Sequence, residues 1–402
     1  MDSIFGQFGY DYSRDAQYHD RLDRDQNLSN VSVVAEGWTR PARRLLFREV
    51  KIENRAHLQE EVEEGMGQYV RGLEIRGSGW NGMTSLEAAS AVFKLLKQVP
   101  NLRRLRLVAP PFDSFDTADS ASMRAVVLLP HFHDLSLPNT RFPHSIIFDL
   151  LATSGHRIDR LFVNNIYDSL IPHAVYRQLD FRGSLRFLST GASFYRTLVD
   201  PRWMNHERLE GLEELQLRGI DVKSRAGGED LYRVVAPTLR TLTIDSDELT
   251  WFAHFLPLFF NLSRLSISGC CYPYTIPDPA PLLRCLPPSI SFLRLNSDAH
   301  LGPTFSRWTA TPSLVPAGLK QIQIDYIENS DTYQQLPPIP TLCTNYRFDT
   351  INNFQRLSPG TLPFKTIEMW FHNSYLDQPS VVEAECLRLS VVFRQRIQRW
   401  DS

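Results

Sequence analysis

Residues 101–107, NLRRLRL, place Leu102, Leu105 and Leu107 at spacings of three and two residues, with arginine at three of the positions between them. Side chains alternate between the two faces of a β-strand, so Leu105 and Leu107 would be buried together while Arg104 and Arg106 point the other way. One copy of this pattern would indicate a single half-buried strand. Its recurrence along the chain decides the fold.

The same order of apolar residues recurs with a mean spacing of about 26 residues between copies, within the range typical of leucine-rich repeats. A single repeat cannot bury its apolar side alone, so neighbouring repeats stack into one continuous core. The alternative is a set of unrelated buried strands in an α/β fold. The middle apolar residue, or anchor, falls at Val50, Leu73, Leu105, Leu135, Leu161, Leu188, Leu215, Leu242, Leu265, Leu293, Ile322, Tyr346 and Ile367.

The repeat predicts an α/β fold, a leucine-rich-repeat solenoid with a curved parallel sheet on its concave side and helices and irregular arms on its convex side. Residues 85–100 and 145–155 have helical spacing of apolar residues. Residues 249–260 indicate a buried helix, and the proline-rich residues 270–289 leave room only for short helical turns. We expect a short helical segment over 1–47, the solenoid over 48–378, and a capping helix over 379–402.

Composition favours local recognition over a global electrostatic field. The net charge is −2 and hydrophobic residues make up 43% of the chain. Such a balance does not attract nucleic acid or anionic membrane, so we expect neither as a partner. The first residues lack the basic and apolar runs of a secretory signal, and the five cysteines form no disulfide or zinc pattern, so we expect a cytoplasmic or nuclear protein.

The chain carries no recognisable catalytic, phosphate-binding or dinucleotide-binding motif, and we predict no catalytic residue, cofactor or metal ion. His131, His133 and Asp134 form the densest group of metal-ligand types, but the repeat assigns the histidines to the surface. Cys270 and Cys271 lie in a turn and have no evident role. Residues 60–65, EEVEEG, are read as a solvated helix face, with a docking patch as the alternative.

The N-terminal segment resembles the closing part of an F-box in fungal F-box and leucine-rich-repeat proteins. The similarity rests on NLSNVSVVAEGWTRPARRLLFREVKI, residues 27–52, with IFGQFGYDYSRD before it, whereas the usual Leu-Pro-x-Glu start of the box is missing. The resemblance implies binding to the adaptor subunit of a cullin-type ubiquitin ligase. The residues implied in this contact are Ile4, Phe5, Phe8, Val33, Val34 and Trp38.

We therefore predict a non-catalytic recognition protein, a substrate receptor of a cullin-type ubiquitin ligase that holds a protein substrate on its concave face. The alternative is a free scaffold with a decayed F-box; an enzyme built on the solenoid is a remote third. Arginines and aromatic residues that alternate with the anchors are the expected contacts, and Phe187 is also expected to be exposed. The partner-binding residues are Arg76, Arg104, Arg106, Arg160, Phe162, Arg218, Arg264, Phe292, Arg294 and Trp370.

Overall fold

The computed structural model describes most of residues 48–398 and leaves the first 47 and last four residues outside the description. Within 48–398, the residues that are not described are 55–66, 81–82, 111–116, 139, 141–143, 155–156, 165–180, 182–184, 201–203, 221–227, 247–248, 269–279, 298–300, 327–331, 346–353, 358–359, 361 and 373–378. The six residues predicted to contact an adaptor, and Cys270 and Cys271, therefore lie outside the described residues.

Parallel strands of five to eight residues recur along the described chain, and their order in the sheet is their order in the chain. Their bounds are β1 Glu49–Asn54, β2 Gly72–Gly79, β3 Arg104–Val108, β4 Asp134–Pro138, β5 Arg160–Asn164, β6 Phe187–Gly191, β7 Glu214–Ile220, β8 Thr241–Ser246, β9 Arg264–Ser268, β10 Phe292–Ser297, β11 Gln321–Tyr326, β12 Thr341–Asn345, β13 Thr366–His372 and β14 Val392–Gln398.

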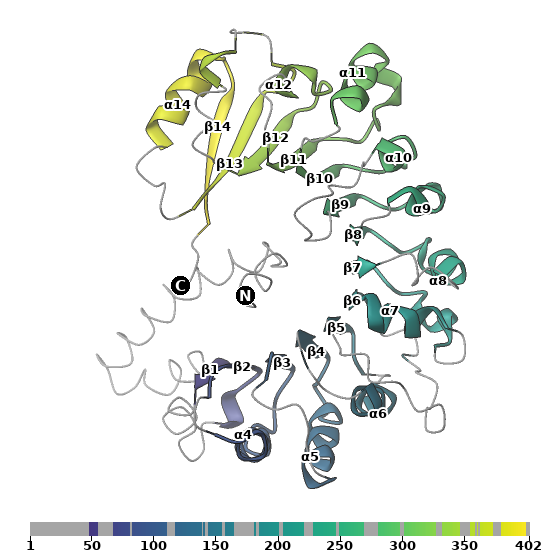
Figure 1. Ribbon diagram of the computed structural model, residues 1–402, viewed down its shortest axis with the longest axis vertical. Coiled ribbons are helices and arrows are strands. Elements are labelled where there is room, and N and C mark those ends of the chain that lie inside the picture. Colours follow the sequence, from purple (N-terminus) through teal and green to yellow (C-terminus); the bar gives the residue numbers. More distant parts are fainter. Residues whose placement is uncertain are drawn as a thin grey trace. The chain divides into compact units, whose positions relative to one another are not determined.

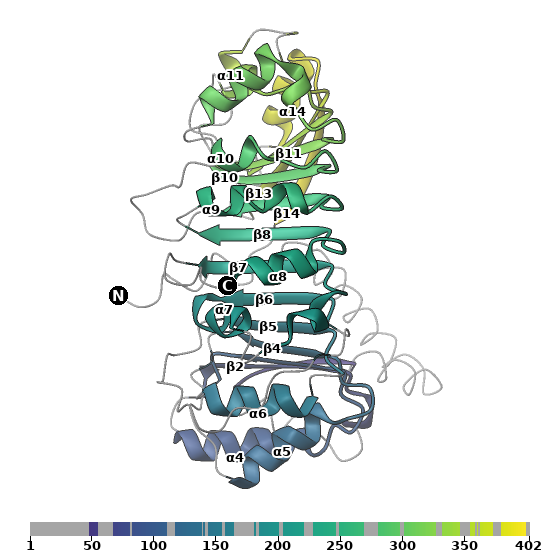
Figure 2. The same cartoon turned by 90° about the vertical axis from the view of Figure 1, so that its right-hand side faces the viewer.

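The chain divides into two compact units. The N-terminal unit holds β1 to β6 and the C-terminal unit holds β8 to β14, while β7 has residues in both. In each unit the helices lie on one side of the sheet (Figure 1 and Figure 2). One strand per repeat, followed by a return through a helix or irregular arm, is the fold of a leucine-rich-repeat solenoid.

The α-helices of the N-terminal unit, of eight to twelve residues, are longer than most of those in the C-terminal unit. In the N-terminal unit they are η1 Gly67–Tyr69, α4 Ser85–Leu96, α5 Thr117–Val127, α6 His144–Ser154, α7 Ala192–Val199, η2 His206–Leu209 and α8 Gly228–Val235. In the C-terminal unit they are α9 Leu249–Ala253, η4 Leu256–Leu258, α10 Ala280–Leu283, α11 Gly302–Ala310, η5 Pro312–Leu314, α12 Thr332–Gln335 and α14 Pro379–Arg388.

Helix α4 shows how the sequence defines a helix of the repeat. Thr84, rather than the neighbouring serine, caps the helix: its hydroxyl accepts the Glu87 N–H, and the Glu87 carboxylate accepts the Thr84 N–H. This reciprocal arrangement satisfies two backbone donors at the start of the helix. Ala88, Val92 and Phe93 then turn toward the sheet and are buried.

The anchors form the core, as the repeat predicts. In the described part of the chain every predicted anchor is at most 8% exposed, and most are fully buried. The backbone ladder repeats with them: the carbonyl before most strands accepts the N–H groups of two residues in the next repeat, as Arg71 O does from Arg103 and Arg104. The predicted solenoid is confirmed, with its anchors in register from strand to strand.

The twelfth anchor was assigned wrongly. The register pairs Ile322 with Leu342, and Leu342 with Ile367, so Leu342 is the anchor of this repeat, while Tyr346 lies outside the described residues. The search missed this repeat because Thr344 occupies its third apolar position, where it is 2% exposed. Threonine fits a buried strand because its branched side chain packs well on a pleated surface.

The expected C-terminal helix is also wrong, because the segment forms a helix followed by a strand. Helix α14 ends at Arg388, Ser390 adopts a left-handed conformation with φ of 61°, and β14 then pairs with β13. Phe393 lies in register with the anchor Ile367, so β14 is a further repeat strand. The alternation of Phe393 and Ile397 with Arg394 and Arg396 has the period of two that is typical of a strand.

The two helices expected at 85–100 and 145–155 are present as α4 and α6, and the described part of the proline-rich segment, 280–289, contains the short helix α10. The apolar stretch 249–260 forms the short helix α9 and the turn η4 instead of one helix. Across the described residues, no helix combines the length and the apolar character needed to cross a membrane.

Candidate functional site

The strand residues that alternate with the buried ones form one surface of each unit, which we call the strand face. Strand β3 illustrates it: Leu105 and Leu107 are buried, while Arg104 is exposed and Arg106 is partly exposed. Nine of the ten predicted partner-binding residues lie on strands at such positions with described side chains; Trp370 lies on β13, but its side chain is outside the description. Whether these residues bind a partner stays a prediction.

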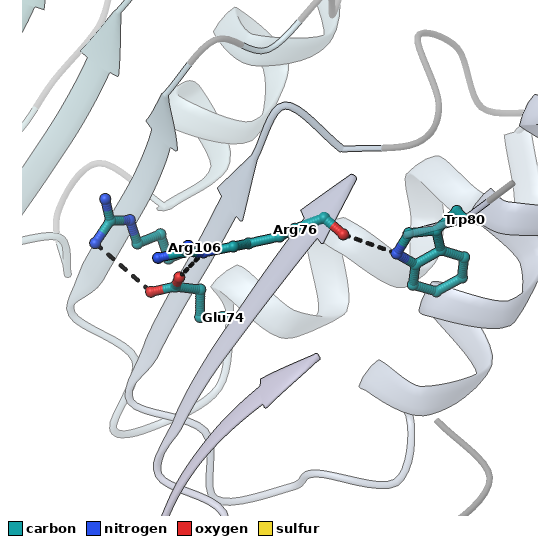
Figure 3. A network of polar contacts seen from close by, with 4 residues as sticks. All are labelled: Glu74, Arg76, Trp80 and Arg106. Atoms are coloured by element: carbon teal, nitrogen blue, oxygen red, sulfur yellow. Dashed lines mark hydrogen bonds and ion pairs between the residues drawn. The ribbon is translucent and has the colours of Figure 1, made fainter. Parts of the chain in front are cut away.

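A carboxylate on β2 holds two arginines from two strands (Figure 3). Glu74 Oε1 lies 2.6 Å from Arg76 Nε, and Glu74 Oε2 lies 3.6 Å from Arg106 Nη1. Trp80 Nε1 donates to Arg76 O at 2.7 Å, which fixes the backbone at the end of the strand. Arg106 Nε is buried, and no hydrogen-bond partner is found for it among the described residues.

A second ion pair crosses over an intervening strand. Glu49 on β1 and Arg104 on β3 form an ion pair, although Gly72 of β2 lies between them in the register. A Cβ on Gly72 would lie 1.9 Å from Glu49 Oε2. The missing side chain of Gly72 is therefore what lets the carboxylate reach the arginine.

Two arginines stack on aromatic rings of the following strand. The Arg160 guanidinium lies 4.3 Å from the centre of the Phe187 ring in the N-terminal unit, and Arg264 lies 4.3 Å from the Phe292 ring in the C-terminal unit. Cation–π contacts of this kind favour a fixed arginine orientation. Phe187 was expected to be exposed, but it is only 5% exposed because it lies beneath Arg160.

The middle of the strand face in the N-terminal unit is more buried than the sequence indicates. Asp134 and Ser136 on β4 are 7% and 5% exposed. Arg160 Nε lies 3.8 Å from Asp134 Oδ2, so the buried carboxylate keeps a positive charge close by. Phe162, on the next strand, stays partly exposed.

The C-terminal unit has one compact charged group on its strand face. Asp325 Oδ2 accepts from Arg294 Nε at 3.0 Å and from Arg294 Nη2 at 2.9 Å, and Asp325 Oδ1 accepts from Gln323 at 2.7 Å. The Asp325 side chain is 8% exposed. Arg218 is partly exposed and donates to Gln216 at 3.3 Å.

Features with possible chemistry elsewhere in the described residues have structural explanations. His131 is exposed and His133 partly exposed, and no group of three potential ligands that could hold a metal ion is found in the described part. An open hollow beside α8 contains His206, whose Nε2 is engaged by Leu198 O at 2.8 Å. The hollow is lined by Met204, Asn205, His206, Glu207, Asp230, Arg233 and Val234.

Sequence reasoning missed Glu49 and Gly72, which together determine how Arg104 is held. The signal was present: once the anchors are aligned, Glu49, Gly72 and Arg104 occupy the same position in three successive repeats. The sequence-based selection considered arginines and aromatic residues one at a time, and therefore did not compare these three aligned positions.

Comparisons with known proteins find similar chains among solved structures, and those reported below share little sequence with this chain. No family model matches the chain, and no curated protein matches it. Among solved structures, the crystal structure of a TLR13–ssRNA13 complex shares 12% identity over 82% of this chain, with a TM-score of 0.38. A leucine-rich-repeat protein of Leptospira interrogans shares 12% identity over 89% of this chain, with a TM-score of 0.29. The chain spans 47% of the first structure's length and 80% of the second's.

Proposed function

We propose that the protein is a non-catalytic recognition module that binds a protein partner on the strand face of its N-terminal unit. The observation that carries the proposal is the set of oriented arginines on β2, β3 and β5. Arg76 and Arg106 share Glu74, and Arg160 stacks on Phe187. Guanidinium groups held in fixed orientations lose less conformational freedom on binding than free surface arginines do.

A protein partner fits this surface better than a nucleic acid does. Glu74 and Asp134 lie among the arginines, so the strand face carries both signs of charge. A nucleic-acid track would need a mainly basic stripe, whereas interspersed charges suit a partner with a matching pattern. The Arg106 side chain is 30% exposed, so its guanidinium can pair with a carbonyl or carboxylate of the partner.

Site-specific photo-crosslinking tests the proposal in the full chain. A photoreactive amino acid at Phe162, partly exposed on the strand face, should crosslink a partner reproducibly. The same group at Leu86, 60% exposed on α4 at the helix side, should not. The crosslinked protein is then purified, and its affinity is measured for the wild type, for Arg104→Gln with Arg106→Gln, and for the control pair Arg196→Gln with Arg233→Gln.

The strand-face variant should weaken binding and the control should not. Arg196 and Arg233 are exposed on α7 and α8 of the same unit, so the control removes the same charge from the helix side. Crosslinks that appear only at Leu86, or equal losses in both variants, would contradict a strand-face site.

We further propose that the partner is a substrate delivered to a cullin-type ubiquitin ligase in the cytoplasm or nucleus. This finer role is supported only by the resemblance of residues 1–47 to the end of an F-box. The test is binding of purified cullin adaptor to the intact chain and to Phe5→Asp. Association that is lost in the variant supports the receptor role, and absence of association favours the free scaffold.

A further inference from the structure

The residues immediately before the strands form a row along the edge of the sheet at which the N-terminal ends of the strands lie. In the N-terminal unit, Arg48 O accepts from the N–H groups of Arg71 and Gly72, and Arg71 O accepts from those of Arg103 and Arg104. Arg48, Arg71 and Arg103 therefore occupy equivalent positions in the first three repeats. Neighbouring strands are about 4.8 Å apart, so three guanidinium groups start from one short backbone row.

The sign of charge along this row changes after the third repeat. His133, Asp159, Arg186 and Glu213 occupy the following positions. Arg186 Nη1 lies 3.7 Å from Glu213 Oε1, so there the row contains an ion pair between neighbouring repeats. Like charges directly opposite each other on neighbouring strands are destabilising. The first three repeats depart from the alternation and place three positive charges side by side.

No carboxylate among the described residues compensates these three arginines. Arg71 Nη1 donates to the backbone carbonyls of Gln68 at 3.1 Å and Asn101 at 3.3 Å. Arg48 and Arg103 are exposed and form no ion pair with a residue that the structure describes. Burial, followed by the charges of Arg103 and Arg48, lowers the pKa of the Arg71 guanidinium from its usual value.

We propose that Arg48, Arg71 and Arg103 form a docking site for an acidic segment of a protein partner. Carboxylates arriving from outside would pair with exposed guanidinium groups and relieve the repulsion among them. The row is short, and Asp159 and Glu213 follow it. A short positive row followed by positions of mixed charge fits a brief run of aspartate or glutamate better than a nucleic-acid backbone, which favours a continuous basic track.

The site adjoins the strand face because Arg103 is followed directly by Arg104. The inference deepens the proposed function, on which it rests, by naming the charge of the partner segment that enters beside the strand face. The edge and the strand face are nevertheless different surfaces with different residues. The residues of one surface can therefore be substituted without altering the residues of the other.

The test measures fluorescence anisotropy of a labelled peptide containing a run of glutamates, with the full chain as receptor. The variant Arg48→Gln with Arg103→Gln removes two exposed charges and leaves the hydrogen bonds of Arg71 in place. The matched control, Arg186→Gln with Arg240→Gln, removes two charges from the same row of later repeats. Thermal melts of both variants check that the fold is retained, and Arg48→Lys with Arg103→Lys checks that charge is what matters.

The peptide should bind saturably to the wild type, and binding should weaken as salt is added. Affinity should fall about fivefold to tenfold in the edge variant, since each exposed ion pair contributes modestly. It should be unchanged in the control and largely kept in the lysine variant. A peptide in which glutamine replaces glutamate should not bind.

Three results would overturn the docking site: no saturable binding of the acidic peptide, equal losses in the edge and control variants, or tighter binding of an oligonucleotide of equal charge to the same arginines. Crosslinking at Phe162 tests the strand face independently of the acidic peptide. If the peptide fails while the Phe162 crosslink survives, the docking site falls and the proposed function stands. If both fail, the proposed function falls as well.

Discussion

The two units share a fold but treat the row before the strands differently. In the N-terminal unit Arg48, Arg71 and Arg103 occupy three successive positions of this row, and Arg48 and Arg103 are exposed. In the C-terminal unit the row continues through Arg240, Ser263, Ser291, Lys320, Pro340 and Lys365, so uncharged residues separate its positive charges. The Ser263 and Ser291 hydroxyls each donate to the carbonyl of the preceding repeat at 3.1 Å. The N-terminal row thus places three positive charges in neighbouring repeats, whereas the C-terminal row separates its positive charges by uncharged residues. Function is therefore sought in the N-terminal unit, although the two cores are alike.

The largest expected effect tests whether the units differ only at the surface. Leu105 and Leu265 are anchors at 1% and 0% exposure in the two units. Leu105→Ala and Leu265→Ala should each lower the free energy of unfolding by ~2–5 kcal/mol, because a packed interior does not fully close the cavity. Urea denaturation measures this. A large loss in one variant and none in the other would show that the cores are not equivalent.

The next effect concerns how each unit holds its charges. Arg294→Met leaves the buried Asp325 carboxylate with the Gln323 amide as its hydrogen-bond partner among the described side chains, and should cost ~1–3 kcal/mol. Arg104→Met breaks an ion pair whose arginine side chain is 49% exposed, and should cost less than ~1 kcal/mol. Comparable losses, measured by chemical denaturation, would remove this distinction between the units.

A buried polar pair distinguishes the helix layer of the N-terminal unit. The hydroxyls of Tyr195 and Tyr232 are 2.7 Å apart, whereas Tyr333 and Phe354 of the C-terminal unit meet through their rings. Tyr195→Phe leaves the Tyr232 hydroxyl without this partner and should cost ~1–2 kcal/mol. The double variant, with Tyr232→Phe added, should recover part of that loss in a double-mutant cycle. Additive losses would argue against the pair.

The same pair predicts a loss of stability at alkaline pH. Burial is the main cause that raises the pKa of both tyrosines above the usual value. A raised pKa in the folded state means that the contribution is complete below the unfolded pKa of about 10 and is lost as pH rises above it. Thermal melts across this range should fall less steeply for the double phenylalanine variant than for the wild type.

The smallest effect is expected on the proposed binding face. Arg104→Gln with Arg106→Gln should change the free energy of unfolding by only about 0.5 kcal/mol, because both side chains are at least 30% exposed. The same variant should weaken partner binding. Marked unfolding would show that these arginines belong to the structure of the N-terminal unit rather than to its recognition surface.

The features that could be predicted from the sequence are those that depend on the regular spacing of apolar residues. Apolar residues such as Leu105 and Leu265 recur at intervals that only stacked strands can bury, so the fold and its core follow from spacing alone. Period failed at Thr344, where a polar residue takes a buried position, and at Ser390, where a backbone reversal separates a helix from a strand.

The candidate site was less accessible to this reasoning. The arginines could be assigned to one face, but which carboxylate or ring holds each one depends on neighbours some 30 residues away in the chain. Arg160 and Phe187 are one such pair, and Arg294 and Asp325 are another. The burial of Phe187 is a consequence of that pairing, and no property of Phe187 itself indicates it.

Gly72 has a consequence for how this surface could change over generations. Because Glu49 reaches Arg104 only across the space above Gly72, replacing this glycine with alanine would displace the carboxylate, although neither charged residue is altered. Arg104 would then be available to an outside acid at unchanged formal charge. A substitution of one uncharged residue by another on β2 would thus change which partners Arg104 on β3 can bind. A comparison of charges between related chains would not reveal this change.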